Sequence, residues 1–334
     1  MILGVGGYWV FLTRAGGLAF LLSNLEIRTS IQAGNNYFVA LTALLPVAVA
    51  ILIYSNRFGS SQMRSIAVVC LVVVSTGILL TLGGRKPAIA LFATVLFVKH
   101  YGVSRMRRLK PLHLLLVAAI GVFFVLNPVL REPGGLERAV ADPSSIVASA
   151  AGNAGAIVAD ISPVPIYIFV TSEFGPSNIW LGESYLDLAY APVPSGIFPE
   201  KPPVDDGVYI RSIVAGIEAE PGSPFSELFP SSLPPETLGA SYMNFWLPGV
   251  IAGMYILGVL RTAAFTYMRS SGESLLSILI YSHVVLSFEL SNLRIVQFLT
   301  FLVMTALFFR IFFGGVSTAA HSNRSRRDQM LLRR

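Results

Sequence analysis

Long apolar segments alternate with short basic connections along most of this chain, and one long polar segment interrupts the alternation. Each apolar segment is close to the ~20 residues that a helix needs to cross a ~30 Å hydrocarbon core, if the shortest is extended through Tyr101. The pattern therefore predicts an all-α, polytopic membrane bundle with spans near Tyr37–Ser55, Ser65–Leu82, Pro87–Val98, Pro111–Leu130, Asn244–Met268, Ser274–Leu290 and Leu293–Phe313.

The chain begins with an apolar segment, Ile2–Asn24, that contains Arg14. An arginine at the bilayer centre costs roughly 2.5–3.5 kcal/mol on insertion scales, so we expect the end of one span followed by a short interfacial helix. Met1–Val5 lacks the charged region and cleavage signal of a secretory peptide. A chain that opens in mid-pattern is typical of an N-terminally truncated protein.

The polar segment, Arg131–Met243, holds 14 of the 18 acidic residues and 15 of the 20 prolines, but four of the 24 basic residues. Basic residues beside short spans tend to stay cytoplasmic, whereas a long loop crosses the membrane regardless of its charge. We therefore expect N-terminal spans in 1–130, a large periplasmic or extracellular loop in 131–243, C-terminal spans in 244–313, and a basic cytoplasmic tail in 314–334.

Composition agrees with a membrane protein and excludes several other classes. The chain is 54% hydrophobic and 13% charged, and its mean hydropathy is +0.68, which is more apolar than a soluble domain. Basic loops facing anionic headgroups explain the pI of about 9.5, so we expect no nucleic-acid partner. The single Cys70 rules out a disulfide framework and a Cys/His metal site.

Outside the large loop, four basic residues would lie on the outer side, against the positive-inside trend: Arg28, Arg85, Lys86 and Arg294. Charges of this kind at a membrane are functional-site candidates by default. The alternatives are anchoring to lipid phosphates or pairing with Glu26 and Glu289.

Gly83-Gly84-Arg85-Lys86-Pro87 is the clearest of these places. The glycines permit a tight turn and close approach of a ligand, and Pro87 suits the first turn of a helix whose N-terminus favours anions. Arginine can donate two hydrogen bonds to one phosphate, and the lysine adds a point charge. A simple inter-helix turn is the alternative.

Three stretches, in the right order, resemble the Wzy-type O-antigen and oligosaccharide repeat-unit polymerases. Gly83-Gly84-Arg85 is similar to their Gly-Ser-Arg, with Gly84 in place of Ser. Pro192 to Pro202 resembles their proline-rich loop segment ending in Pro-x-Lys-Pro. Gly239 to Gly249 resembles their Asn-Phe-Gly entry into a helix, although Trp246 replaces the usual glycine. The resemblance extends from the outer loop at Asn24–Arg28 to Phe313.

The resemblance implies a GT-C-like glycosyltransferase in the bacterial cytoplasmic membrane, with an undecaprenyl-pyrophosphate-linked oligosaccharide as substrate. A chain-length regulator and a flippase are further expected partners. Such an enzyme needs no nucleotide cofactor and no metal, because protein cations stabilise the pyrophosphate leaving group. The expected cations are Arg28, Arg85, Lys86, Lys201, Arg211 and Arg294.

The acceptor hydroxyl needs a base, which a loop carboxylate can supply. Glu183 and the pair Asp205-Asp206 are the candidates, although the prolines and glycine around the pair favour a solvated turn. Tyr185 can stack on a sugar ring or pack in a loop core. His283, in the middle of an apolar segment, is more typical of a packing residue than of a catalyst.

Two other functions remain open. An O-antigen ligase of the same superfamily is expected to carry a histidine in the outer loop, and 131–243 contains none. A transporter is expected to place polar groups at mid-depth in several spans, and from the sequence only His283 stands there. Polymerase is therefore ranked first, ligase second and transport third.

Overall fold

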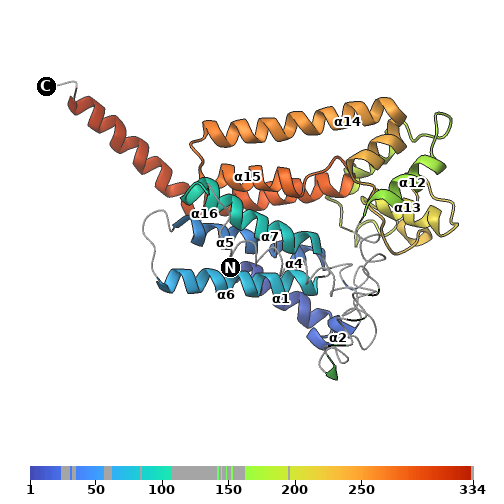
Figure 1. Ribbon diagram of the computed structural model, residues 1–334, viewed down its shortest axis with the longest axis horizontal. Coiled ribbons are helices and arrows are strands. Elements are labelled where there is room, and N and C mark those ends of the chain that lie inside the picture. Colours follow the sequence, from blue (N-terminus) through green and yellow to red (C-terminus); the bar gives the residue numbers. More distant parts are fainter. Residues whose placement is uncertain are drawn as a thin grey trace.

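The computed structural model describes residues 1–23, 31, 35–55, 62–82, 85–106, 162–194 and 196–331, with isolated residues between 141 and 152. Within these ranges, nothing is described of the side chains at 22, 23, 36, 85 and 86 or beyond Phe312. Every regular element in the described part is helical (Figure 1). The all-α prediction is confirmed there.

The first half of the chain forms short to medium helices. They are α1 (Ile2–Arg14), α2 (Leu18–Ser23), α4 (Asn36–Leu41), α5 (Leu44–Ser55), α6 (Gln62–Thr81), α7 (Arg85–Phe97) and the π-helical continuation η3 (Val98–Val103). Two glycines with positive φ, Gly16 and Gly17, separate α1 from α2. The apolar N-terminal segment is thus two helices, in the order expected.

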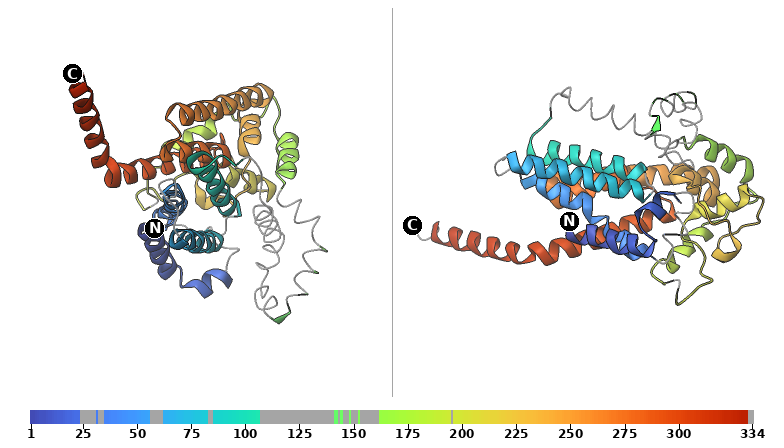
Figure 2. Two further views of the ribbon diagram at one scale, coloured as in Figure 1. Left: turned by 60° about the vertical axis from the view of Figure 1, so that its left-hand side comes forward. Right: turned by 90° about the horizontal axis from the view of Figure 1, so that it is seen from below.

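The second half contains the loop elements and the C-terminal helices. They are α12 (Val164–Glu173), the 3-10 helices η4 (Glu183–Tyr190) and η5 (Phe225–Glu227), α13 (Asp206–Val214), α14 (Glu236–Ser270), α15 (Leu275–Leu286) and α16 (Asn292–Leu331). The last of these extends well beyond the other helices (Figure 2).

Four helical segments of the described part are long and apolar enough to cross a membrane: Tyr37–Ser55, Gln62–Thr81, Glu236–Ser270 and Asn292–Phe312. Two other predicted spans are shorter as helices, namely Pro87–Val103 and Leu275–Leu286. The remaining one, Pro111–Leu130, lies outside the described residues. Length and composition thus support membrane insertion for four of the seven predicted spans.

Helices from both halves of the chain pack together: α15 lies between α14 on one side and α5 and α7 on the other, and α16 also contacts α5 (Figures 1 and 2). The apolar core includes Val49 on α5, Leu91 on α7, Ile278 on α15 and Phe301 on α16, and all four are buried. Only 11–39% of the apolar stretch of each of the four long helical segments is buried by such contacts, so the rest of their apolar surface faces outward, as in helices that lie in lipid.

The longest helix, α14, is two helical arms joined by a sharp reversal at Trp246, which has φ 54° and ψ −149°. Pro248 lies two residues further on and has no amide hydrogen with which to continue the hydrogen bonding of a preceding helix. The short arm, 236–245, therefore folds back against the long arm, 247–270. The predicted start of the span at Asn244 lies two residues before this break.

Two glycines let the arms approach closely. A Cβ on Gly249 would lie 2.4 Å from the Ser241 carbonyl oxygen, and one on Gly253 would lie 2.3 Å from Ser241 Oγ. This is the Gly-x-x-x-Gly spacing that permits tight helix packing. The packing partner is the preceding arm of the same helix.

The polar insertion has a separate apolar core. Trp180 and Tyr209 pack together with Phe174 and Val170, and the group includes Met243 on the short arm of α14. The Trp180 amide also donates to the Met243 carbonyl at 2.9 Å. The short arm thus joins the insertion to the helical bundle.

Candidate functional site: a polar junction

A group of buried and half-buried polar side chains lies where the insertion meets the helical bundle. Four segments contribute: η4, the start of α13, the short arm of α14, and the turn between α15 and α16. We call this group the polar junction. Its residues are Ser184, Tyr185, Asp205, Asp206, Glu236, Thr237, Asn244, Glu289, Ser291, Asn292 and Arg294.

The carboxyl pair belongs to the start of α13. Asp205 is the N-cap, and its Oδ1 accepts from the Gly207 amide at 3.0 Å, as expected of an aspartate in this position. Gly207 is required by close packing, because a Cβ there would lie 2.7 Å from the Leu233 carbonyl carbon. Asp206 is 1% exposed. The solvated turn favoured by the sequence is therefore wrong, because the following helix packs this pair inward.

Asp206 is connected to the last helix by hydrogen bonds. Its Oδ2 accepts from the Asn292 amide at 3.1 Å, and the Asn292 side chain donates to the Ser184 carbonyl. The Ser184 hydroxyl in turn accepts from Asn244 Nδ2 at 2.9 Å. These bonds join η4, α13, α14 and α16, which are separated by up to 108 residues in sequence.

The turn between α15 and α16 is held by a second group of bonds. Thr237 donates its hydroxyl hydrogen to Glu289 and accepts from the Leu290 amide at 2.9 Å. Tyr185 donates to the Leu290 carbonyl at 3.0 Å, while its ring stacks on Phe245. The ring and the hydroxyl of Tyr185 thus both contact other residues of the protein.

Two arginines contact acids of the junction, one from within it and one from the long arm of α14. Arg294 lies 3.8 Å from Glu236 and donates to Gln297 at 2.8 Å, and its side chain is 17% exposed. Arg261, on the long arm of α14, lies 3.5 Å from Glu289. The sequence allowed Glu289 to pair with an outer cation such as Arg294. In the structure Glu289 pairs with Arg261, and Arg294 lies beside Glu236.

The surroundings in the junction raise the pKa values of two of its acids, Asp205 and Asp206. Burial raises the pKa of Asp206 to about 8, opposed by the Asn292 amide and reinforced by the charge of Asp205. Burial also raises the pKa of Asp205, while Ser232, Gly207 and the positive charge of Arg294 act in the opposite direction. Groups with shifts of this kind in one place are candidates for function.

Tyr185 is affected by the same surroundings. Burial raises its pKa to about 12, and the charge of Asp206 adds to the effect. The phenol is therefore neutral at physiological pH and serves as a hydrogen-bond donor.

Other predicted site residues lie elsewhere. Lys201 donates to the carbonyls of Val193, at 2.6 Å, and Tyr190, at 3.5 Å. Arg211 lies over the Phe229 ring, 4.9 Å from its centroid. Glu183 is exposed at the start of η4. The structure does not bring these three into the hydrogen-bonded group of the junction.

The remaining predicted cations are outside the description. Arg28 is not among the described residues, and Arg85 and Lys86 form the first turn of α7 without described side chains. Their predicted role in anion binding stays a prediction. His283 stacks on Phe301 at 4.1 Å between ring centroids, which is the packing role that we expected.

Several junction residues did not stand out in the sequence. Glu236, Thr237 and Asn292 each begin or precede a helix, so they resemble ordinary helix-start residues. One signal was present: Glu289-Leu-Ser291-Asn292-Leu-Arg294 places four polar residues within an otherwise apolar stretch. Polar groups inside such a stretch indicate a buried partner.

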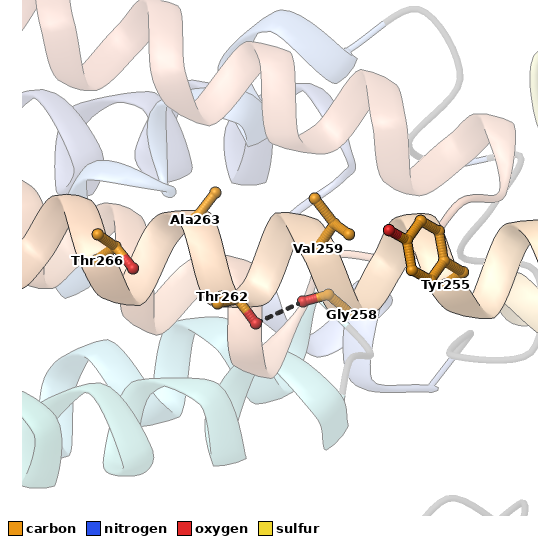
Figure 3. A pocket seen from close by; sticks show the side chains of 6 residues that line it. All are labelled: Tyr255, Gly258, Val259, Thr262, Ala263 and Thr266. Carbon is orange, nitrogen blue, oxygen red and sulfur yellow. Dashed lines mark hydrogen bonds between the residues drawn. The ribbon is translucent and has the colours of Figure 1, made fainter.

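A shallow open groove of about 710 Å³ follows the long arm of α14, away from the junction. Figure 3 shows its six lining residues on this one helix, with Thr262 donating to the Gly258 carbonyl at 2.9 Å. The other lining residues are Tyr255, Val259, Ala263 and Thr266. None of these six lining residues is charged.

The site has to be interpreted from its own geometry. No protein-family model, curated protein or solved structure matches this chain.

Proposed function

We propose that this chain is a GT-C-like membrane glycosyltransferase that joins lipid-linked oligosaccharide repeat units. The bundle lies in the bacterial cytoplasmic membrane, the insertion lies on the outer side, and the tail is cytoplasmic. The observation that carries the proposal is the polar junction. The junction contains loop residues Asp205 and Tyr185 together with Arg294 of the last helix. All three are site residues predicted from the sequence.

The junction offers the two kinds of group that the transfer requires. The acceptor hydroxyl forms a bond to the anomeric carbon of the donor, the bond from that carbon to the pyrophosphate oxygen breaks, and the hydroxyl proton passes to a base. Asp205 is our candidate for the base, because it is less enclosed than Asp206 and has a raised pKa.

The pyrophosphate leaving group takes up negative charge and is stabilised by cations. Arg294 is the described candidate, since it is already oriented by Glu236 and Gln297. Arg28, Arg85 and Lys86 supply further positive charge on the same side in this proposal. Lys201 and Arg211 would act as positioning residues, because both shape the proline-rich part of the insertion.

A polymerisation assay tests the proposal. The purified full chain, given a lipid-pyrophosphate-linked repeat unit, should produce a ladder of longer glycans on the lipid. Arg85→Ala should abolish the ladder, because no other group at the N-terminus of α7 can donate two hydrogen bonds to one phosphate, and Arg85→Lys should fail as well. Arg310→Ala, an exposed residue on α16, is the control. Ladders of wild-type length from Arg85→Ala would remove this arginine from the mechanism.

The orientation has its own test. In a Cys70→Ser background, which removes the exposed native thiol, a cysteine at Ser195 should react with a membrane-impermeant reagent from outside. A cysteine at Ser104 should react only after the membrane is opened, because the basic segment 99–110 stays cytoplasmic. Labelling of both positions from the same side would contradict the arrangement of spans.

Transport of a lipid-linked sugar is the second candidate function. The helices at the junction are interrupted, α14 at Trp246 and the α15–α16 pair at 287–291, and polar groups gather at the breaks. Transporters place substrate sites at such discontinuous helices. The polymerisation assay separates the two functions, because a transporter would move the repeat unit across a vesicle membrane without lengthening it.

A further inference from the structure

Three buried oxygens of the polar junction have no hydrogen-bond partner among the described residues. They are Asp206 Oδ1, Ser291 Oγ and Asn292 Oδ1, and the three residues are 1%, 2% and 0% exposed. Buried polar atoms are nearly always satisfied by protein, water or an ion. Three unsatisfied oxygens on residues of the same helix–helix contact therefore favour a ligand at that contact.

The three residues belong to one contact. The Asn292 amide donates to the second oxygen of Asp206 at 3.1 Å, and Ser291 is the residue directly before Asn292. Asp206 lies in the first turn of α13 and Asn292 in the first turn of α16. The unsatisfied oxygens thus lie along the seam that joins the insertion to the bundle.

The charge around this seam is negative. Asp205 and Asp187 both act on Asp206 as like charges, and Glu236 acts on Asp205. Arg294 is the described cation that acts on the pair, through Asp205. Within the described ranges, Asp206 forms no ion pair.

Helix ends work against this excess but are too weak to cancel it. The N-termini of α13 and α16 each carry about half a positive charge. Above the pKa of Asp206, about 8, the helix ends and Arg294 supply about two positive charges against the carboxylates of Asp187, Asp205, Asp206 and Glu236. A cation at the seam is therefore electrostatically favoured.

We propose that Asp206, Ser291 and Asn292 bind a small hard cation, with sodium as the expected ion. Carboxylate, amide and hydroxyl oxygens are the donors that hard cations take, rather than the thiolates and imidazoles of zinc sites. One carboxylate among three donors matches a single positive charge better than a calcium site, which uses six to eight oxygens and several carboxylates. The cation would fasten the insertion to α16 and is separate from the proposed glycosyl transfer.

The experiment measures thermal unfolding of the full chain in detergent at pH 8.5. Sodium chloride is compared with choline chloride at the same ionic strength, and calcium and magnesium chloride form two further arms. Since a ligand that binds the folded state raises the unfolding midpoint as its concentration rises, we expect the midpoint to increase with sodium. A response to calcium or magnesium alone would assign a divalent ion to the same oxygens.

Variants separate a specific site from a general salt effect. Asp206→Asn should remove the response, and Ser291→Ala should raise the half-saturating sodium concentration roughly tenfold. Ser291 forms no described side-chain hydrogen bond, so this variant should still fold. Ser75→Ala is the matched control, because Ser75 is equally buried with an unpartnered hydroxyl but lies on α6.

Two results would overturn the proposal. Equal midpoints in sodium, choline, calcium and magnesium would mean that water or a proton on Asp206 satisfies the seam. A cation response of wild-type size in both Asp206→Asn and Ser291→Ala would place the binding site elsewhere.

Discussion

Gly249→Val is expected to lower the unfolding free energy by about 3 kcal/mol, the upper range for overpacking a tight contact. A Cβ at this position would lie 2.4 Å from the Ser241 carbonyl oxygen and 2.5 Å from Phe245 Cβ. Neither atom can move away without opening the reversal at Trp246. Chemical or thermal unfolding in detergent, together with the yield of monodisperse protein, measures the loss.

The same helix supplies the control for this experiment. A Cβ on Gly258 would meet nothing within 4 Å, so Gly258→Val introduces the same β-branched side chain into α14 without a clash. Gly258→Val should change the unfolding free energy by less than about 1 kcal/mol, because valine has a somewhat higher helix propensity than glycine and its side chain meets no neighbour. Equal losses for Gly249→Val and Gly258→Val would mean that the two arms of α14 do not pack as described.

Arg294→Ala is expected to reduce glycan polymerisation at least ~100-fold, the effect of removing one preorganised donor from a site that stabilises developing charge. The change also removes the guanidinium that lies 3.8 Å from Glu236 and the positive charge that acts on Asp205. The measurement is the rate of chain extension by purified protein at saturating lipid-linked repeat unit.

Stability must be separated from chemistry in this case. Arg294→Lys keeps the charge beside Glu236 and should retain the unfolding midpoint, yet it loses the two-donor geometry that suits a pyrophosphate. We therefore expect Arg294→Lys to fold normally and polymerise poorly. Arg310→Ala should change neither the unfolding midpoint nor the rate of polymerisation. A normal extension rate from folded Arg294→Ala would exclude this residue from the reaction.

The helical architecture could be predicted because it depends on local properties. Apolar runs such as Gln62–Thr81 and Asn292–Phe312 are long and nearly free of charge, and helices of that composition form in isolation from the rest of the fold. The lengths of the individual helices were less predictable. The run expected to extend from Ser274 to Leu290 forms a helix of 12 residues, because the chain turns at 287–291 to bond Thr237 and Tyr185.

The candidate site was only partly predictable. Asp205, Tyr185 and Arg294 stood out, because a loop carboxylate, an aromatic residue and an outer arginine each have a recognisable chemistry. Lys201 and Arg211 looked equally suitable and instead contact carbonyls and an aromatic ring within the insertion. A sequence shows which groups are charged, but it does not show which of them the insertion uses for its own packing.

By itself, the sequence determined the all-helical class of the described part, the place of the polar insertion, and four of the seven predicted spans, which the structure bears out as long apolar helical segments. These features follow from the composition and the hydrophobic periodicity of short stretches of sequence, each only a few helical turns long. The tertiary structure alone decided that Asp206 is buried against Asn292, that Arg261 pairs with Glu289, and that α14 folds back at Trp246. Those outcomes depend on contacts between residues up to 86 positions apart, whose partners are set by packing and not by any local pattern.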